Sequence, residues 1–351
     1  MIKNRNYSLD LLRVIACYLV IQQHASEFYY IGEGGTVVTG SNTFWIGITL
    51  CRSSVPLFVM LSGFLLLPMQ DKISTFFRKR FTRIVYPFIA WCVLYAGYYV
   101  LSRGDSFSQM ALNILHIPVN FGCEIGHLWY IYMLIGLYLV TPIISPWLQQ
   151  ASKRELEGYL GLWIITTFLP YIHLVYPEVL GEAFWNDTPL LYYFTGFIGY
   201  FILGYYLKRF GYPSAALSWI ILIVGFALSA GIFCSRIDTV PTVPELELSW
   251  GFCTVNVFLM TLGLFSLIGR LSLKGKNAAC KLLSDISIKS YGMYLAHILF
   301  LNFYYGLFKS ISDAAYVTIP LIAVCTFIRI FVILPAQKQV YHRIIYKTCH
   351  Q

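Results

Sequence analysis

Charged residues are scarce in this chain of 351 residues. Asp, Glu, Lys and Arg make up 12% of it, whereas an ordinary soluble domain carries about 25%. Hydrophobic residues reach 58%, and the mean hydropathy is +0.66. This composition excludes a water-soluble globular enzyme, a disordered chain and a nucleic-acid-binding module. The sequence therefore predicts a polytopic membrane protein.

Several motifs that are common in soluble proteins are also missing. The nine cysteines lie far apart and form no CxxC pair, so we predict neither a disulfide framework nor a zinc site, and we expect no metal. The lack of a G-x-S-x-G motif argues against a serine hydrolase. Because there is no Gly/Ser-rich linker or repeat, we expect one membrane domain over residues 1–351, with a short cytoplasmic tail from about residue 336.

Ten apolar segments are long enough to cross a bilayer, which takes roughly 20 residues in a helix. They cover residues 8–29, 45–67, 84–102, 128–148, 157–175, 189–207, 215–234, 251–269, 288–307 and 314–335. We therefore expect an all-α bundle of about ten transmembrane helices.

Lysine and arginine set the orientation of these spans. With a cytoplasmic N-terminus, 19 of the 25 basic residues fall in cytoplasmic segments, 3 in outer loops and 3 within spans. Both termini are therefore predicted to be cytoplasmic, and the net charge of +9 reflects this bias rather than nucleic-acid binding. We interpret the acidic residues of the outer loops, among them Glu245 and Glu247, as solvated charges.

The first span carries four ionisable residues on one face. Arg13 and His24 are eleven positions apart, which places them on about the same side of an α-helix, roughly 16 Å apart along its axis. Asp10 precedes Arg13 by three positions and Glu27 follows His24 by three. Because ionisable groups are costly in a bilayer, this stripe indicates a functional site. A structural stripe that pairs with another helix is the alternative.

Three other polar positions lie within predicted spans. Arg52 in the second span is expected at a depth similar to that of His24. Ser62 and Gly63 in the same span are typical of close helix packing. His297 lies in the middle of the ninth span, where a buried, hydrogen-bonded histidine is a simpler interpretation than a catalytic one.

The densest basic cluster is FFRKRFTRIVYP, which runs from Phe76 to Pro87 at the cytoplasmic mouth of the third span. Arg80 and Arg83 are three positions apart and should face the same way on a helix. Two interpretations stay open. The cluster fixes topology and meets lipid phosphates, or the paired guanidinium groups bind the phosphates of a nucleotide-bearing cofactor.

The fourth span begins with a histidine and two aromatic residues. His127, Trp129 and Tyr130 stand at its outer end. Aromatic side chains at such a position ordinarily form an interfacial belt.

Five blocks of the sequence occur in the order typical of a known family. They are LDLLRVIA with the Arg13–His24 pair, SVPLFVMLSGFL, RKRFTRIVYP, HLWYIYMLIGLYLVTPI and SYGMYLAHILF, and they extend from about residue 8 to residue 300. Together they resemble the acyltransferase-3 family of integral membrane acyltransferases, whose members have ten spans.

The resemblance implies an enzyme that transfers an acyl group, usually acetyl from acetyl-CoA, to a hydroxyl of a carbohydrate or lipid-linked glycan. It implies location among the lipids of a bacterial inner membrane. It also implies that Arg13 and His24 are essential and that Arg80 and Arg83 lie where the donor enters.

One position departs from the family pattern. Many members carry a glutamate seven residues after the histidine of the fourth-span block, and this chain has Leu134 there. The pattern resembles more closely the subgroup that contains the enterobacterial common antigen O-acetyltransferase. That resemblance favours a surface-polysaccharide precursor over peptidoglycan as the acceptor.

These observations suggest a role for each candidate residue. His24 acts as a general base that Glu27 orients, and Arg52 or Arg13 stabilises the developing oxyanion. A transporter of a small anionic or sugar-like solute is the alternative function, since intramembrane polar residues also line solute pathways. The remaining assignments are acetyl-CoA binding by Arg80 and Arg83, and acceptor binding by His127, Trp129, Tyr130, His297 and Ser62.

Overall fold

The computed structural model of the protein is helical throughout the part that it describes, which comprises residues 5–40, 42–47, 51–176, 191, 194–273 and 277–334. Within these residues the extended pairings are two isolated β-bridges, Ile31 with Val37 and Thr36 with Thr242. The predicted all-α class is therefore confirmed. The chain divides into two compact units, one of residues 1–64 and 156–351 and the other of residues 65–155.

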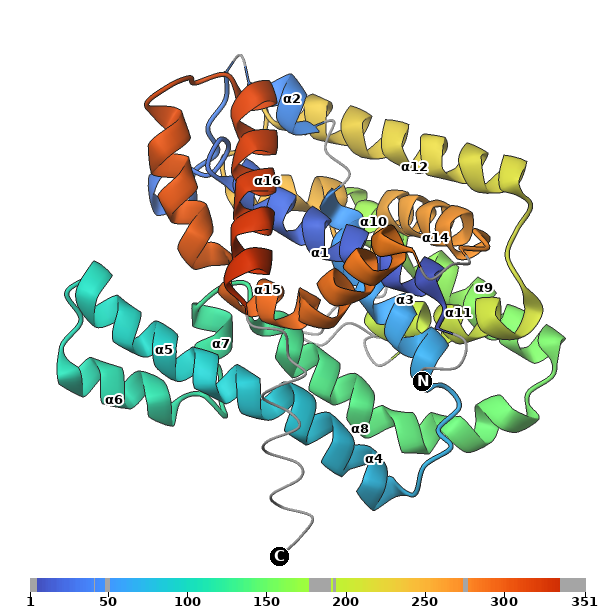
Figure 1. The fold of residues 1–351 in the computed structure, drawn as a ribbon. Coiled ribbons are helices and arrows are strands. Elements are labelled where there is room, and N and C mark those ends of the chain that lie inside the picture. The colour runs from blue at the N-terminus through green and yellow to red at the C-terminus, as the bar shows by residue number, and fades with distance from the viewer. Residues whose placement is uncertain are drawn as a thin grey trace, which may run out of the picture. The chain divides into compact units, whose positions relative to one another are not determined.

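The first unit contains both ends of the sequence and most of the helices (Figure 1). Its long helices are α1 (Tyr7–Glu27), α3 (Ser54–Leu66), α9 (Lys153–Thr166), α11 (Phe197–Phe210), α12 (Ala215–Arg236), α14 (Val255–Gly269), α15 (Ala278–Lys309) and α16 (Ala315–Ile333). Its short elements are η1 (Glu33–Gly35), α2 (Thr43–Gly47), η2 (Cys51–Ser53), α10 (Leu169–Val175), α13 (Val243–Glu247) and η4 (Leu248–Trp250). A few residues of α3 and α9 belong to the second unit.

The second unit is built on a helix that is continuous from residue 73 to residue 102. That helix consists of α4 (Ile73–Arg80), a π-helical turn η3 (Phe81–Val85) and α5 (Tyr86–Ser102). The unit also contains α6 (Phe107–Leu115), α7 (Phe121–Glu124) and α8 (Trp129–Gln150). The π turn ends just before Pro87, which has no backbone N–H to donate to the preceding turn. The basic cluster predicted from the sequence therefore includes a local change of helix type.

Helix α1 lies beside α15 and runs in the same direction. The Cys17 Sγ atom contacts the Ser290 carbonyl oxygen at 3.7 Å, and further along the two helices the Phe28 ring stacks on Tyr305 at a centroid distance of 4.1 Å. Helix α16 runs the opposite way, since Tyr18 meets Phe327 whereas Tyr29 hydrogen-bonds Thr318. These directions are the ones expected of the first, ninth and tenth predicted spans.

Among the residues that the structure describes, five helices are long and apolar enough to cross a bilayer. They cover residues 73–102, 129–150, 153–175, 215–236 and 315–333. Val243–Trp250 and Val255–Gly269, bent by 46°, would together make a sixth. The protein is thus a helical membrane protein, while the count of ten spans and the cytoplasmic termini remain predictions.

The predicted spans and domain boundaries agree with the observed elements to different degrees. The second predicted span, 45–67, contains the end of α2, the turn η2 and the 13-residue helix α3, while residues 48–50 lie outside the described residues, so this span remains a prediction. The predicted tail from about residue 336 lies outside the described residues. The single domain over residues 1–351 remains a prediction about how the two units fold together.

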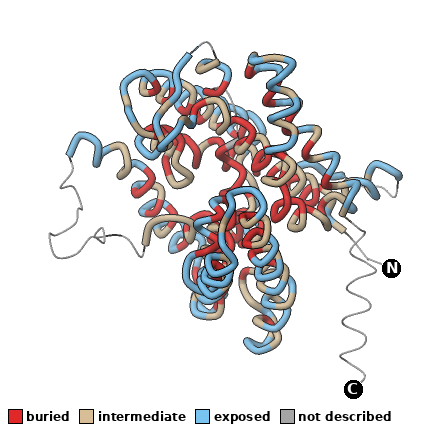
Figure 2. Tube along the Cα trace, turned by 90° about the vertical axis from the view of Figure 1, so that its left-hand side faces the viewer, coloured by how far each residue is buried: buried red, intermediate tan, exposed pale blue. Residues whose placement is uncertain are grey.

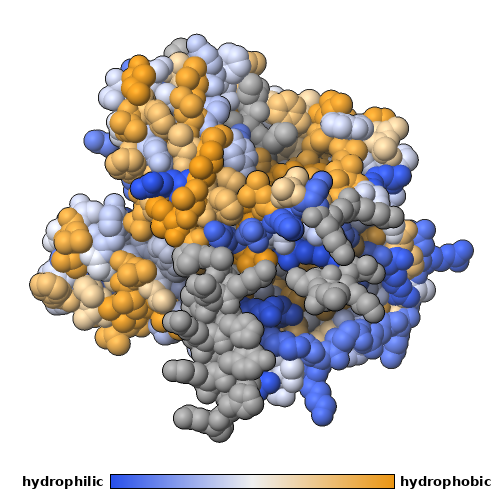
Figure 3. All heavy atoms as spheres, in the orientation of Figure 1, coloured by the Kyte–Doolittle hydropathy of each residue, from blue (hydrophilic) through white to orange (hydrophobic). Residues whose placement is uncertain are grey.

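Apolar side chains project from the outer faces of several helices. On α16 the exposed residues Val317, Leu321, Val324 and Ile328 follow helical spacing, whereas Ile322 on the opposite face is fully buried. Figure 2 shows buried and exposed positions alternating along individual helices. Figure 3 shows how widely apolar residues cover the visible face. Such faces are suited to lipid contact, since in water they would be large exposed apolar patches.

Helices α3 and α11 pack closely because each has a glycine where the other approaches. A Cβ atom at Gly63 would overlap the Phe201 carbonyl oxygen, and one at Gly204 would overlap the Met60 carbonyl oxygen. The two backbones therefore approach too closely for any larger residue. The predicted close packing at Gly63 is confirmed.

Gly204→Ala should lower the free energy of unfolding, because the new methyl group must displace the α3 backbone. Overpacking of this kind costs about 1–3 kcal/mol. Thermal unfolding of the detergent-solubilised protein measures the change. Gly231→Ala on α12, where a Cβ meets nothing within 4 Å, is the matched control and should not lower stability. Equal destabilisation by the two substitutions would contradict the close crossing.

Candidate active site

The two units divide the predicted site residues between them. The first unit holds Arg13, His24, Glu27, Arg52, Ser62 and His297, and the second holds Arg80, Arg83, His127, Trp129 and Tyr130. Each group is therefore described within its own unit.

His24 lies at the centre of a polar cluster between α1 and α15. Its Nδ1 atom is 2.7 Å from Glu27 Oε2, one turn further along the same helix. Its ring contacts the His297 ring, with centroids 5.1 Å apart and planes inclined by 39°. The sequence predicted the His24–Glu27 contact, and the structure adds the second histidine.

The hydrogen bonds of both histidines fix their tautomers when the rings are neutral. Because a carboxylate accepts hydrogen bonds, His24 Nδ1 carries the proton in its bond to Glu27, and Nε2 keeps its lone pair. His297 Nδ1 lies 2.6 Å from the Tyr294 carbonyl oxygen, which is likewise an acceptor. His297 is therefore also protonated at Nδ1. The Nε2 atoms of both rings therefore carry lone pairs. The His24 side chain keeps 16% exposure whereas His297 is fully buried, so His24 Nε2 is the basic atom that a substrate can approach.

Buried Arg52 forms an ion pair with the half-buried Glu247 at the end of the site near Glu27. Its Nη2 atom donates to Glu247 Oε1 at 2.5 Å, and Tyr30 Oη donates to the same oxygen at 3.1 Å. The guanidinium group also lies over the Trp250 ring, 5.4 Å from its centroid. The interpretation of Glu247 as a solvated loop charge was therefore wrong, because it is the partner of an arginine with 5% exposure.

The Arg52 cluster is linked to the histidine cluster. The positive charge of Arg52 acts on the Glu27 carboxylate, and the Gln23 side chain lies close enough to influence it. Ser54 Oγ in turn donates to Gln23 Oε1 at 3.4 Å. Segments that are distant in the sequence thus meet around Glu27.

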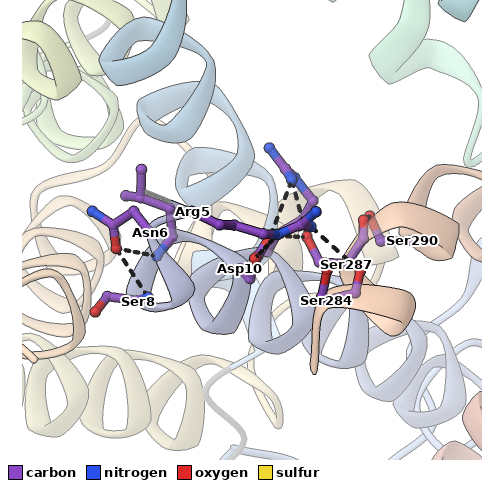
Figure 4. A network of polar contacts seen from close by, with 9 residues as sticks. Arg5, Asn6, Ser8, Asp10, Ser284, Ser287 and Ser290 are labelled. Atoms are coloured by element: carbon purple, nitrogen blue, oxygen red, sulfur yellow. Dashed lines mark hydrogen bonds and ion pairs between the residues drawn. The ribbon is translucent and has the colours of Figure 1, made fainter. Parts of the chain in front are cut away.

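At the other end of the polar stripe, Arg13 belongs to a separate network. Figure 4 shows Arg5, Asp10 and Ser287 of this network close together. Its Nη1 atom donates to Ser287 Oγ at 3.0 Å, and Ser287 Oγ donates to Asp10 Oδ1 at 2.6 Å. Arg5 holds the same carboxylate at 2.5 and 2.9 Å, and also reaches the Ser284 carbonyl oxygen. This half of the stripe thus pairs with helix α15. It corresponds to the structural alternative that the sequence left open.

Arg5 precedes α1, and its ionisation follows from this network. The hydrogen bond to Asp10 raises the pKa of the Arg5 guanidinium above its usual value, so Arg5 stays charged. Asp10, with 4% exposure, is therefore compensated by a permanent positive charge. A buried carboxylate without such a partner would be costly.

Ser62 does not belong to the histidine cluster as the structure describes it. Its hydroxyl donates to the Phe58 carbonyl oxygen in its own helix at 2.9 Å. Its assignment to acceptor binding stays a prediction.

In the second unit, the basic cluster surrounds the π turn. Arg80 ends α4 and lies over the Phe76 ring at 5.3 Å, while Arg83 lies within the π turn. The two guanidinium groups are within electrostatic range of each other. Lys79 instead pairs with Asp71 at 2.9 Å. The α-helical spacing used to predict a shared direction does not apply across the π turn, because that turn is wider.

The residues at the start of α8 are packed against aromatic rings. His127 is buried, and its ring meets that of Tyr95 edge-on at 5.5 Å. Trp129 and Tyr130 contact each other at 6.4 Å. Their assignment to acceptor binding remains a prediction.

Across the residues that the structure places, no group of three or more His, Cys, Asp or Glu side chains is arranged to hold a metal ion.

Sequence reasoning missed four residues that complete these networks, namely Tyr30, Glu247, Trp250 and Ser287. One signal for Glu247 was present, because an intramembrane arginine such as Arg52 requires a compensating acid. The sequence offered several acidic loop residues and no means of choosing among them. Ser287 had no signal of its own.

Comparison with known proteins gives a consistent result. The family described as an acyltransferase domain matches residues 6–336. YfiQ of Bacillus subtilis (strain 168), an inferred membrane-bound acyltransferase, is 23% identical over 331 residues, which cover 90% of this chain and 87% of the relative. No solved structure matches the chain.

Glu247→Gln should destabilise the protein by about 1–2 kcal/mol, because it removes the carboxylate charge to which Arg52 Nη2 donates. Urea or thermal unfolding of the purified protein checks the change. Glu245→Gln removes an equal charge from an exposed residue two positions earlier, and should have a much smaller effect. If Glu247→Gln is as stable as that control, the ion pair contributes nothing to folding.

Proposed function

The chain belongs to this family of membrane acyltransferases, and we propose that it transfers acetyl from cytoplasmic acetyl-CoA to a hydroxyl of a cell-surface polysaccharide or its lipid-linked precursor. The observation that carries the proposal is the His24–Glu27 hydrogen bond. It gives an imidazole within the membrane region a defined tautomer, and so a basic nitrogen of known position.

The proposed reaction needs one base that also acts as an acid. His24 Nε2 takes the proton from the acceptor hydroxyl as its oxygen attacks the thioester carbonyl carbon. The tetrahedral intermediate then collapses, the C–S bond breaks, and the imidazolium returns its proton to the departing thiolate. Glu27 stabilises the imidazolium through the Nδ1 hydrogen bond. A two-step route through an acyl-histidine uses the same residues.

Of the two arginines predicted to stabilise the oxyanion, we assign that role to Arg52. Its charge acts on Glu27, the hydrogen-bond partner of His24. Arg52 therefore acts at the end of the site that contains His24. Arg13 is tied to Asp10 and Ser287, about 16 Å away along an ideal helix. Its importance is therefore proposed to be in aligning α1 with α15 rather than in touching the reacting carbonyl.

Arg80 and Arg83 are proposed to bind the phosphates of acetyl-CoA. Phosphate recognition favours guanidinium groups, which offer paired N–H donors. The π turn supports this role, because single turns of π-helix occur frequently at functional sites.

We propose that acceptor binding involves Ser62, His127, Trp129 and Tyr130. The half-buried Trp129 ring beside polar groups suits a sugar ring, which has both apolar faces and hydroxyls. This chain has Leu134 where many members of the family have a glutamate. That difference is the basis for proposing a surface-polysaccharide precursor as the acceptor. We accordingly place the protein in a bacterial inner membrane, without a metal cofactor.

His24→Gln should lower acetyl transfer by about 10³-fold, because it removes the base while keeping a polar side chain of similar size. The assay uses the purified protein in detergent, radiolabelled acetyl-CoA and a glycan extract, and it follows label on the glycan. His173→Gln, at an exposed histidine of α10, is the control and should be fully active. Normal transfer by His24→Gln would rule out the assignment. Solute flux without acetyl-CoA would point to the transporter.

Arg80→Gln and Arg83→Gln should each raise the KM for acetyl-CoA about tenfold, since each removes a charge-assisted contact to phosphate. Steady-state kinetics at saturating acceptor gives the comparison. Arg78→Gln, at an exposed neighbour in α4, should leave the KM unchanged. An effect shared by all three variants would indicate general electrostatic attraction to the membrane surface instead of a donor site.

A further inference from the structure

His297 occupies the position on α15 that faces His24. Helices α1 and α15 run parallel, and their contacts advance together from Arg13 with Ser287 to Cys17 with Ser290. The next ring contact along this seam is His24 with His297, at 5.1 Å. The pairing of the two histidines is thus part of a continuous helix–helix register.

The His297 ring is held rigidly in this place. Its Nδ1–H bond to the Tyr294 carbonyl fixes one edge, and the Tyr294 ring packs against it with centroids 5.9 Å apart. A buried ring fixed by a hydrogen bond and by packing on two sides keeps a single orientation. His297 is therefore a fixed surface against which His24 can be positioned.

Burial separates the roles of the two histidines. His297 has 0% of its surface exposed, so an acceptor has no part of it to touch. The His24 side chain keeps 16% exposure. Of the two rings, His24 is the one that a substrate can reach, and any effect of His297 on the reaction passes through it.

We propose that His297 is a positioning residue for His24. The ring contact, together with the Glu27 hydrogen bond, holds His24 in the one rotamer that directs Nε2 toward the acceptor hydroxyl. This replaces the prediction that His297 binds substrate, and it rests on the proposed function of His24 as a base. A base held by one hydrogen bond alone could rotate about that bond, and misplacement by about 1 Å can cost up to 10²-fold in rate.

The test compares three variants of the detergent-solubilised, full-length protein. His297→Ala removes the ring, and His297→Phe keeps a ring but not the Nδ1 bond. Leu301→Ala removes an equally buried side chain from the same helix and is the control. Two quantities are measured, namely kcat with both KM values in the acetyl-transfer assay, and the rate at which diethylpyrocarbonate modifies His24 near neutral pH, followed by peptide mass spectrometry.

We expect His297→Ala to lower kcat on the order of tenfold, with both KM values changed less than about twofold. It should also raise the His24 modification rate about threefold or more, because His24 loses the ring that shields and holds it. His297→Phe should stay near the wild type in both quantities. Leu301→Ala should lose stability without changing either quantity in the folded protein.

Two outcomes would overturn the proposal. Unchanged kcat and unchanged His24 modification in His297→Ala would show that the contact positions nothing. A raised acceptor KM with normal kcat would return His297 to substrate binding. The modification rate does not depend on turnover. If the wild type transferred no acetyl while His24 reactivity still responded to His297, the positioning would stand and the proposed function would fail.

Discussion

The need to pair ionisable groups inside a bilayer shapes this structure more than any other constraint. An unpaired charge in an apolar medium is costly, and α1 carries several ionisable side chains along one face. Asp10 is satisfied by Arg5 and by Ser287 of α15, and His24 by Glu27 and the His297 ring. These contacts fix the register of α1 against α15. Placing the polar stripe in the membrane costs free energy, and the contacts that offset this cost also align the two helices of the site.

The rest of the site depends on that register. Arg52 lies outside α1 and α15, on the short turn that precedes α3, yet its charge reaches Glu27. Helix α3 is in turn set by its glycine crossing with α11 at Gly63 and Gly204. Helix α13 then supplies Glu247 as the counter-ion of Arg52. Each contribution comes from a different part of the chain, and each is held by packing or charge pairing. Such support suits the proposed active site, because a functional constellation must be held within about 0.5 Å of its productive geometry.

The features that could be predicted from the sequence are those that depend on composition and on the local spacing of residues. Low charge and long apolar runs specify a helical membrane protein, and helical periodicity places Arg13 and His24 on one face. The partner of that face could not be predicted, because Ser287 is about 270 positions away and its pairing is a matter of tertiary packing. Glu247 was misjudged for a related reason, since a loop position indicates exposure but not which buried charge lies beneath it. The π turn at Arg83 was not predicted either. We attribute it to the missing N–H of Pro87, and the surrounding sequence has an ordinary helical pattern.

The Arg52–Glu247 ion pair has an electrical consequence. A single charge that crosses the full membrane potential exchanges about 2.3 kcal/mol per 100 mV, whereas two opposite charges held 2.5 Å apart carry no net charge. The transmembrane voltage therefore exerts little net force on this pair. An arginine in the same place without Glu247 would experience that force in full. The pairing thus makes the position of the Arg52 side chain less sensitive to voltage.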